Sequence, residues 1–159
     1  MRFLDGAEAV EAERFTAEAV TVARRSPCEK SKRGVIIVSD SEVIGRGYNK
    51  PPADVPCVEE FCGLICRKYC VHAETNAVMD ALRGGHELKG SRGYHIKVKG
   101  GAVRDSDDLS CVPCAALVLE SGMGEFVLKH PRGFAVYGAR EFYELSLDAF
   151  IRQKSSNGK

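Results

Sequence analysis

The sequence predicts an α/β fold in which helices cover both faces of a mixed β-sheet. Short apolar, β-branched runs alternate with amphipathic helical stretches along most of the 159 residues. The first two runs are close enough to pair as an antiparallel hairpin, whereas helices separate most of the later ones. Since neither an internal repeat nor a linker-like stretch divides the chain, we expect a single domain over residues 1–153.

The first third of the chain is expected to form a helix followed by the hairpin. Residues 7–25 place apolar side chains on one side of a helix, which Ser26-Pro27 ends. Residues 35–38 form an apolar, β-branched run that is typical of a buried strand. A second strand is expected at 43–48, with Asp40-Ser41 as the tight turn between the two.

Helices and strands alternate through the rest of the chain, so we expect a sheet of about five strands. The expected helices are residues 72–83, 115–121 and 139–153, and the expected strands are 94–98, 125–128 and 134–137. Three other segments are irregular: a cysteine-rich insertion at 50–71, a polar loop at 100–110 and a flexible tail at 154–159.

Two short motifs supply the groups needed for zinc-assisted hydrolysis. His72-Ala73-Glu74 begins one helical run, and Cys111-Val112-Pro113-Cys114 precedes another. A catalytic zinc has three protein ligands and one open position, which predicts His72, Cys111 and Cys114 as ligands. Zinc lowers the pKa of a bound water from about 16 to roughly 7. Glu74 is close enough in sequence to take the proton of that water.

Each motif also has a simpler interpretation. A C-x-x-C pair alone fits a thioredoxin-like redox site or half of a structural zinc site, and a lone His-x-Glu is common. Neither explains why both motifs stand at helix starts, where the positive end of the helix favours thiolates. We therefore favour a catalytic metal centre.

The two motifs resemble the H-x-E…P-C-x-x-C signature of zinc-dependent cytidine and deoxycytidylate deaminases, in which the glutamate is the general acid and base. The run that begins at His72 (HAETNAV) and the segment Gly47-Tyr48-Asn49 are most similar to the deoxycytidylate branch. The sequence departs from the signature at Ser110, where the family has proline.

The resemblance implies a three-layer α/β/α sandwich and a hydrolytic reaction. Hydroxide would attack C4 of a cytosine-type base, Glu74 would move the protons, and ammonia would leave. The expected substrate is a free nucleotide or nucleoside of the dCMP type, with Asn49 as a substrate-binding residue. The resemblance also implies a homo-oligomer, and the reaction needs no organic cofactor.

Two other functions stay open. The first is a deaminase that acts on a base within nucleic acid or on a biosynthetic pyrimidine. The formal net charge of +1 disfavours nucleic acid, since nucleic-acid binders usually carry a basic surplus. The second is a non-catalytic, zinc-stabilised binding module, which would have no use for Glu74. A phosphate-binding residue is not determined; the basic candidates are Lys32, Arg33, Lys50 and Arg67.

The cysteine-rich insertion leaves a second zinc open. Its four cysteines are Cys57, Cys62, Cys66 and Cys70. They could form a closed structural site, with Cys28 or a histidine completing it, or Cys70 could be a small buried residue beside His72. The resemblance supports the second zinc. Because no apolar run is long enough to span a membrane and no secretory leader pattern is visible, we expect a cytoplasmic protein.

Overall fold

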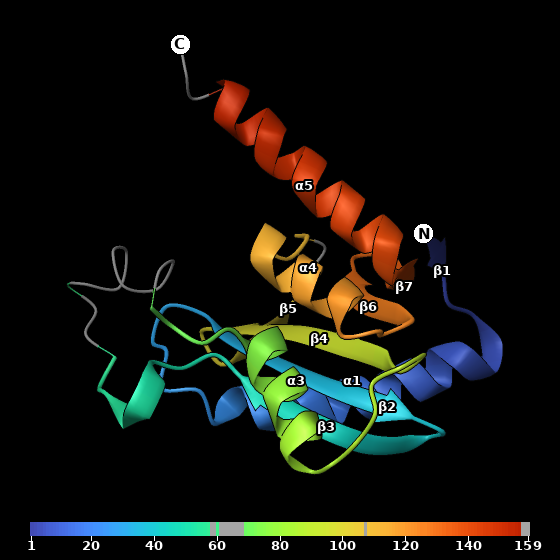
Figure 1. The fold of residues 1–159 in the computed structure, drawn as a ribbon, viewed down its shortest axis with the longest axis horizontal. Coiled ribbons are helices and arrows are strands. Elements are labelled where there is room, and N and C mark those ends of the chain that lie inside the picture. Colours follow the sequence, from blue (N-terminus) through green and yellow to red (C-terminus); the bar gives the residue numbers. More distant parts are fainter. Residues whose placement is uncertain (58–59, 61–68, 107, 157–159) are drawn as a thin grey trace.

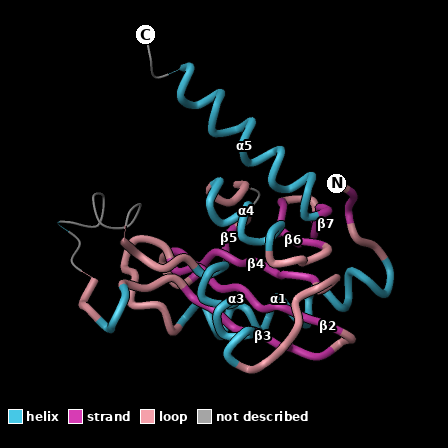
Figure 2. Tube along the Cα trace, viewed as in Figure 1, coloured by secondary structure: helices cyan, strands magenta, loops and turns pink. Residues whose placement is uncertain are grey.

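A mixed β-sheet organises the molecule, which a computed structural model describes at residues 1–57, 60, 69–106 and 108–156. The strand order is β1-β7-β6-β4-β2-β3, and β5 pairs with β4. Helix α1 lies behind this sheet, and α3 and α4 lie in front of it (Figures 1 and 2). The predicted three-layer arrangement is therefore confirmed.

The elements have the following bounds. The strands are β1 (Arg2–Phe3), β2 (Lys32–Ser39), β3 (Glu42–Tyr48), β4 (Arg92–Lys99), β5 (Ala102–Arg104), β6 (Glu125–His130) and β7 (Gly133–Gly138). The helices are α1 (Gly6–Arg24), α3 (Ala73–Arg83), α4 (Val112–Glu120) and α5 (Ala139–Ser156), with a short 3-10 helix at Pro52–Asp54.

Strand β2 buries side chains on both faces of the sheet, so helices pack against both faces. Val35 and Ile37 pack with α3 and α4, whereas Ile36 and Val38 pack with α1. All four side chains are buried. Successive side chains of a strand point to opposite faces, so an unbroken apolar run needs helices on both sides.

The predicted hairpin of β2 and β3 is confirmed. Asp40 and Ser41 adopt φ of 49° and 64°, as a type I′ turn requires, and the two strands pair antiparallel. Strand β2 also pairs antiparallel with β4, and β4 pairs parallel with β6. The carboxyl ends of β3 and β4 therefore lie at the same end of the sheet, near the starts of α3 and α4.

The structure differs from the predicted elements at four places. The loop predicted at 100–110 contains β5, because Gly100 and Gly101 both adopt positive φ and form a second tight hairpin with β4. Strand β1 was missed because two residues show no alternation. Helix α4 begins at Val112, since Pro113 is well suited to a first helical turn. Helix α5 continues to Ser156, beyond the predicted start of the tail at 154; residues 157–159 lie outside the described residues.

Helix α3 packs so closely on β3 that a glycine is needed at the crossing. A Cβ atom on Gly47 would lie 2.2 Å from the backbone nitrogen of Ala77 and 2.3 Å from the carbonyl oxygen of Ala73. We expect Gly47→Ala to lower stability by about 3 kcal/mol, because backbone atoms cannot move aside as a side chain would. Thermal denaturation should show a midpoint lower by roughly 6–12 °C.

The matched control for this substitution is Gly138→Ala. A Cβ atom there meets nothing within 4 Å, and the backbone φ is not positive. This variant should melt close to the wild type. Equal melting temperatures for Gly47→Ala and Gly138→Ala would show that the contact between β3 and α3 is looser than the structure indicates.

Candidate metal centre

The start of helix α3 is held against the end of β3. Lys50 and Val71 exchange two backbone hydrogen bonds of 2.8 and 3.0 Å, and this bridge joins the two ends of the cysteine-rich insertion. Asn76 donates from Nδ2 to the carbonyl oxygen of Tyr48 at 2.8 Å. His72, as the N-cap residue of α3, is thereby fixed at the edge of the sheet.

Helix α4 brings two sulfur atoms to the same place. Cys111 is the N-cap residue of α4, and Cys114 lies in its first turn. The Nδ1 atom of His72 lies 3.3 Å from Sγ of Cys111 and 3.2 Å from Sγ of Cys114, and the two sulfurs are 3.1 Å apart. The structure thus brings the three predicted ligands together as a group that could hold a metal ion.

The two thiols titrate very differently because they share a hydrogen bond. The hydrogen bond between Cys111 and Cys114 is the main reason why the pKa of Cys111 falls to about 5. The same contact and burial raise the pKa of Cys114. One of the two sulfurs is therefore a thiolate at neutral pH, which gives an arriving cation a negatively charged ligand.

The donor set and its spacing fit zinc. Ligand atoms at about 2.0–2.3 Å from a tetrahedral zinc lie about 3.6–3.8 Å from one another, so the three atoms need to separate by only about half an ångström. One imidazole nitrogen and two thiolate sulfurs leave a fourth position open, as in catalytic zinc sites.

Glu74 lies beside this group in the first turn of α3 and is buried. Burial alone would raise its pKa, but the electrostatic interaction with neighbouring His95 and a hydrogen bond from Ser110 outweigh burial and lower the pKa. The Ser110 hydroxyl donates to Oε1 of Glu74 at 2.5 Å. The serine that replaces the family's proline therefore holds the carboxylate in place.

The metal group and Glu74 lie at a cavity of about 310 Å³. Asn49, which we predict to bind substrate, lines this cavity, but three of the hydrogen bonds of its side-chain amide are made to the protein itself. Its Oδ1 accepts hydrogen bonds from the backbone of Arg33 at 2.7 Å and from the Ser26 hydroxyl at 2.9 Å, and its Nδ2 donates to Ser31 at 3.0 Å. One amide N–H remains for a ligand.

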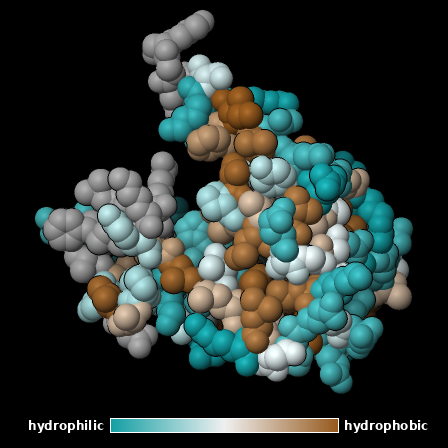
Figure 3. All heavy atoms as spheres, in the orientation of Figure 1, coloured by the Kyte–Doolittle hydropathy of each residue, from teal (hydrophilic) through white to brown (hydrophobic). Residues whose placement is uncertain are grey.

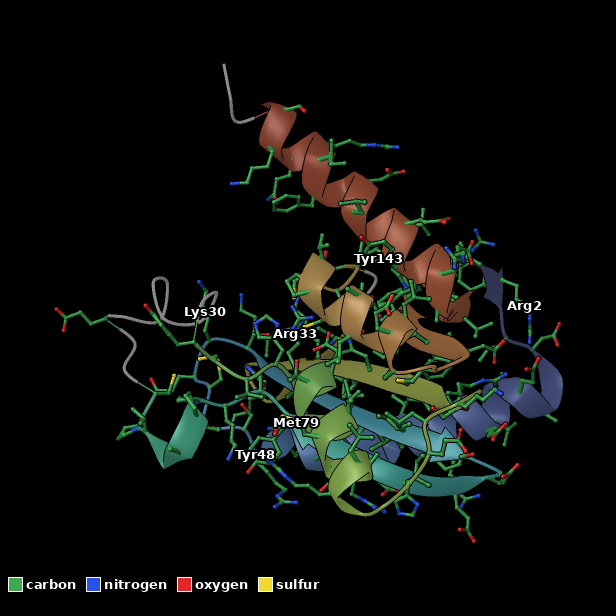
Figure 4. The ribbon with its side chains drawn as sticks, in the orientation of Figure 1. Arg2, Lys30, Arg33, Tyr48, Met79 and Tyr143 are labelled. Carbon is green, nitrogen blue, oxygen red and sulfur yellow. The ribbon has the colours of Figure 1, made fainter. Side chains whose placement is uncertain are left out.

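Three further residues of the cavity wall have chemistry that bears on a ligand. Lys30 and Arg33 lie at the end of the molecule where α3 begins (Figure 4). Arg33 was among several basic candidates in the sequence, whereas Lys30 was not. His95 also lines the cavity, and no sequence pattern selects it beyond its alternation within a strand.

The cysteine-rich insertion is described only in part. Cys62 and Cys66 lie outside the described residues. Cys28 and Cys70 line the same cavity as His72. In the part of the chain that the structure describes, His72, Cys111 and Cys114 are the only group with metal-binding geometry. No helix within the described ranges is long and apolar enough to cross a membrane.

Comparison with protein families identifies the region that contains these residues. Residues 9–130 match the model for the cytidine and deoxycytidylate deaminase zinc-binding region. The deoxycytidylate deaminase of Mycobacterium phage D29 is 32% identical over 129 residues, which cover 72% of this chain and 91% of that protein. The deoxycytidylate deaminase of Schizosaccharomyces pombe is 30% identical over 124 residues, 71% of this chain, and the chain spans only 35% of its length.

Solved structures of dCMP deaminases have a similar fold. The dCMP deaminase of cyanophage S-TIM5, solved in complex with dCMP and dUMP, aligns with a TM-score of 0.58 at 18% sequence identity. The alignment covers 77% of this chain and 82% of the cyanophage chain. At this identity the likeness establishes the arrangement of helices and strands.

Proposed function

Since the chain belongs to the cytidine and deoxycytidylate deaminase family, we propose that it hydrolyses the amino group of a free cytosine nucleotide such as dCMP. The observation that supports this proposal most directly is the position of Glu74, a buried carboxylate beside the three proposed zinc ligands. We assign the zinc to His72, Cys111 and Cys114. A structural zinc site would use a fourth protein ligand and would gain nothing from Glu74.

Each residue of the site has its own role in the proposed reaction. Zinc held by His72, Cys111 and Cys114 would supply a water of lowered pKa and would stabilise negative charge on its oxygen. Glu74 takes the first proton of the attacking water and delivers it to ring nitrogen N3; it then takes the remaining proton of the hydroxyl added at C4 and delivers it to the amine, which leaves as ammonia. Ser110 keeps the carboxylate aimed through both transfers.

The basic residues of the cavity favour a nucleotide over a nucleoside. Arg33 is partly buried on β2, and Lys30 lies near it on the same wall. Within the described ranges neither side chain forms an ion pair, whereas Lys97 of the neighbouring strand is paired with Asp108 at 3.3 Å. Two available cations near the cavity suit a 5′-phosphate, and Arg33 can bind it in a bidentate manner.

The function is tested by ammonia release from dCMP, CMP, deoxycytidine, cytidine, cytosine and a cytosine-containing single strand. We expect dCMP to be the best substrate. Arg33→Met should raise KM for dCMP at least tenfold, because a charge-assisted phosphate contact is lost, and should leave kcat/KM for deoxycytidine nearly unchanged.

Arg83→Met is the matched control, since Arg83 is exposed at the far end of α3. It should match the wild type on every compound. Best activity on the single strand would instead favour a nucleic-acid deaminase. Equal losses on dCMP and deoxycytidine in Arg33→Met would exclude a phosphate contact by this residue.

We also propose that the protein is a homo-oligomer. Apolar side chains are exposed on α3 and α5, and brown surface gathers on the face that these helices form (Figure 3). Helix α5 projects beyond the body (Figure 1), and its Phe150 and Ile151 are 48% and 52% exposed. A second copy would remove this surface from water. Sedimentation velocity that finds only monomers would contradict the proposal.

A further inference from the structure

His95 is a buried residue of the cavity wall, and its Nδ1 atom has no hydrogen-bond partner in the described part of the chain. Only 4% of the residue is exposed, and its Nδ1 is buried with no partner. The residue nonetheless lines the same cavity as Glu74. Buried polar groups are nearly always paired in proteins, so an exception at a ligand cavity points to a partner that arrives with the ligand.

The position of His95 follows from the alternation of β4. Tyr94 and Ile96 pack toward α1, so His95 faces the side on which α3 and α4 begin. The imidazole lies against the ring of Phe126, with centroids 6.4 Å apart, which fixes its orientation. It lies close enough to Glu74 for the carboxylate to act on its pKa. It is not part of the metal-binding group of described residues.

The ring is neutral at pH 7. Burial lowers the pKa of His95 to about 4; Glu74 and Asp108 oppose this effect, whereas Arg33 and Lys97 add to it. A neutral imidazole carries one N–H donor and one bare nitrogen, so it can donate to a carbonyl oxygen.

We propose, on the basis of the proposed function, that His95 contacts the substrate and donates a hydrogen bond to the 2-carbonyl oxygen of the cytosine ring. Glu74 exchanges protons with N3 and with the amine on C4, on the side of the metal. The 2-carbonyl is the next acceptor around the ring, on the side of N3 away from C4. We therefore assign this oxygen to His95, which lines the cavity with Glu74 and lies outside the metal group.

The test compares dCMP with 2-thio-dCMP, in which a sulfur atom of similar position and much weaker acceptor strength replaces the oxygen. We expect the wild type to prefer dCMP at least tenfold in kcat/KM. His95→Phe keeps an aromatic ring against Phe126 but has no donor, so the preference should fall about tenfold. His95→Gln retains an N–H and should keep part of the preference.

His86→Phe is the matched control, because His86 is exposed beyond the end of α3, and it should keep the wild-type preference. Thermal melts confirm that each variant is folded, and if His95→Phe does not fold, His95→Leu, which also lacks a donor, takes its place. Equal losses on both nucleotides, with the preference unchanged, would overturn the proposed contact and leave the deaminase function standing. Absence of dCMP turnover by the wild type would overturn the proposed function and the role of His95 with it.

Discussion

Replacing Glu74 by glutamine is expected to lower kcat on dCMP by about 10³-fold, the usual scale for loss of a general acid and base. The amide has nearly the shape of the carboxylate, and its oxygen can still accept the Ser110 hydrogen bond. It cannot take a proton from water or deliver one to N3. Ammonia release measures the loss, and elemental analysis should show unchanged zinc content.

Two further variants separate proton transfer from positioning. Ser110→Ala removes only the hydrogen bond to Oε1 and should lower kcat about tenfold, because the carboxylate remains but is less well aimed. Glu120→Gln changes an exposed carboxylate at the end of α4 and should behave as the wild type. Wild-type turnover by Glu74→Gln would exclude Glu74 as the general acid and base, whereas absence of turnover by the zinc-loaded wild type would favour a zinc-stabilised binding module.

The order of the major elements could be predicted because local patterns agreed with the final packing. The β2–β3 hairpin has an unbroken apolar first strand and turn residues, Asp40 and Ser41, that tolerate positive φ. Strand β5 was missed because its three residues are exposed and too few to show a pattern. Its signal was Gly100-Gly101, a pair that forms hairpin turns, but that pair was assigned to a polar loop.

The metal group could be predicted because its ligands stand close together in two short motifs. His72 and Cys111 are both N-cap residues, so local helix formation already places them at helix starts. The rest of the cavity depends on contacts across the sheet. His95 and Arg33 come together through the pairing of β2 with β4, which matches Val35 with His95 and Arg33 with Lys97. No local pattern reveals that register.

Removing one metal ligand is expected to have the second large effect. Cys114→Ser should reduce zinc content by one per chain and abolish measurable deamination, because the hydroxyl is a poor ligand at neutral pH and only His72 and Cys111 remain. Since the three ligands join the first turns of α3 and α4, the variant should also melt at a lower temperature. Elemental analysis and thermal denaturation measure the two effects.

The same measurement tests a second, structural zinc, which we propose for the cysteine-rich insertion together with Cys28. The support is that Cys28 and Cys70 both line the cavity that His72 also lines. With two sites, the wild type should hold two zinc ions per chain, and Cys114→Ser and Cys28→Ser should each hold one. One zinc in the wild type, lost only in Cys114→Ser, would exclude the second site. Loss of both ions in Cys114→Ser would mean that the two sites depend on each other, because the first turn of α3 would then need the catalytic metal to hold the insertion in place.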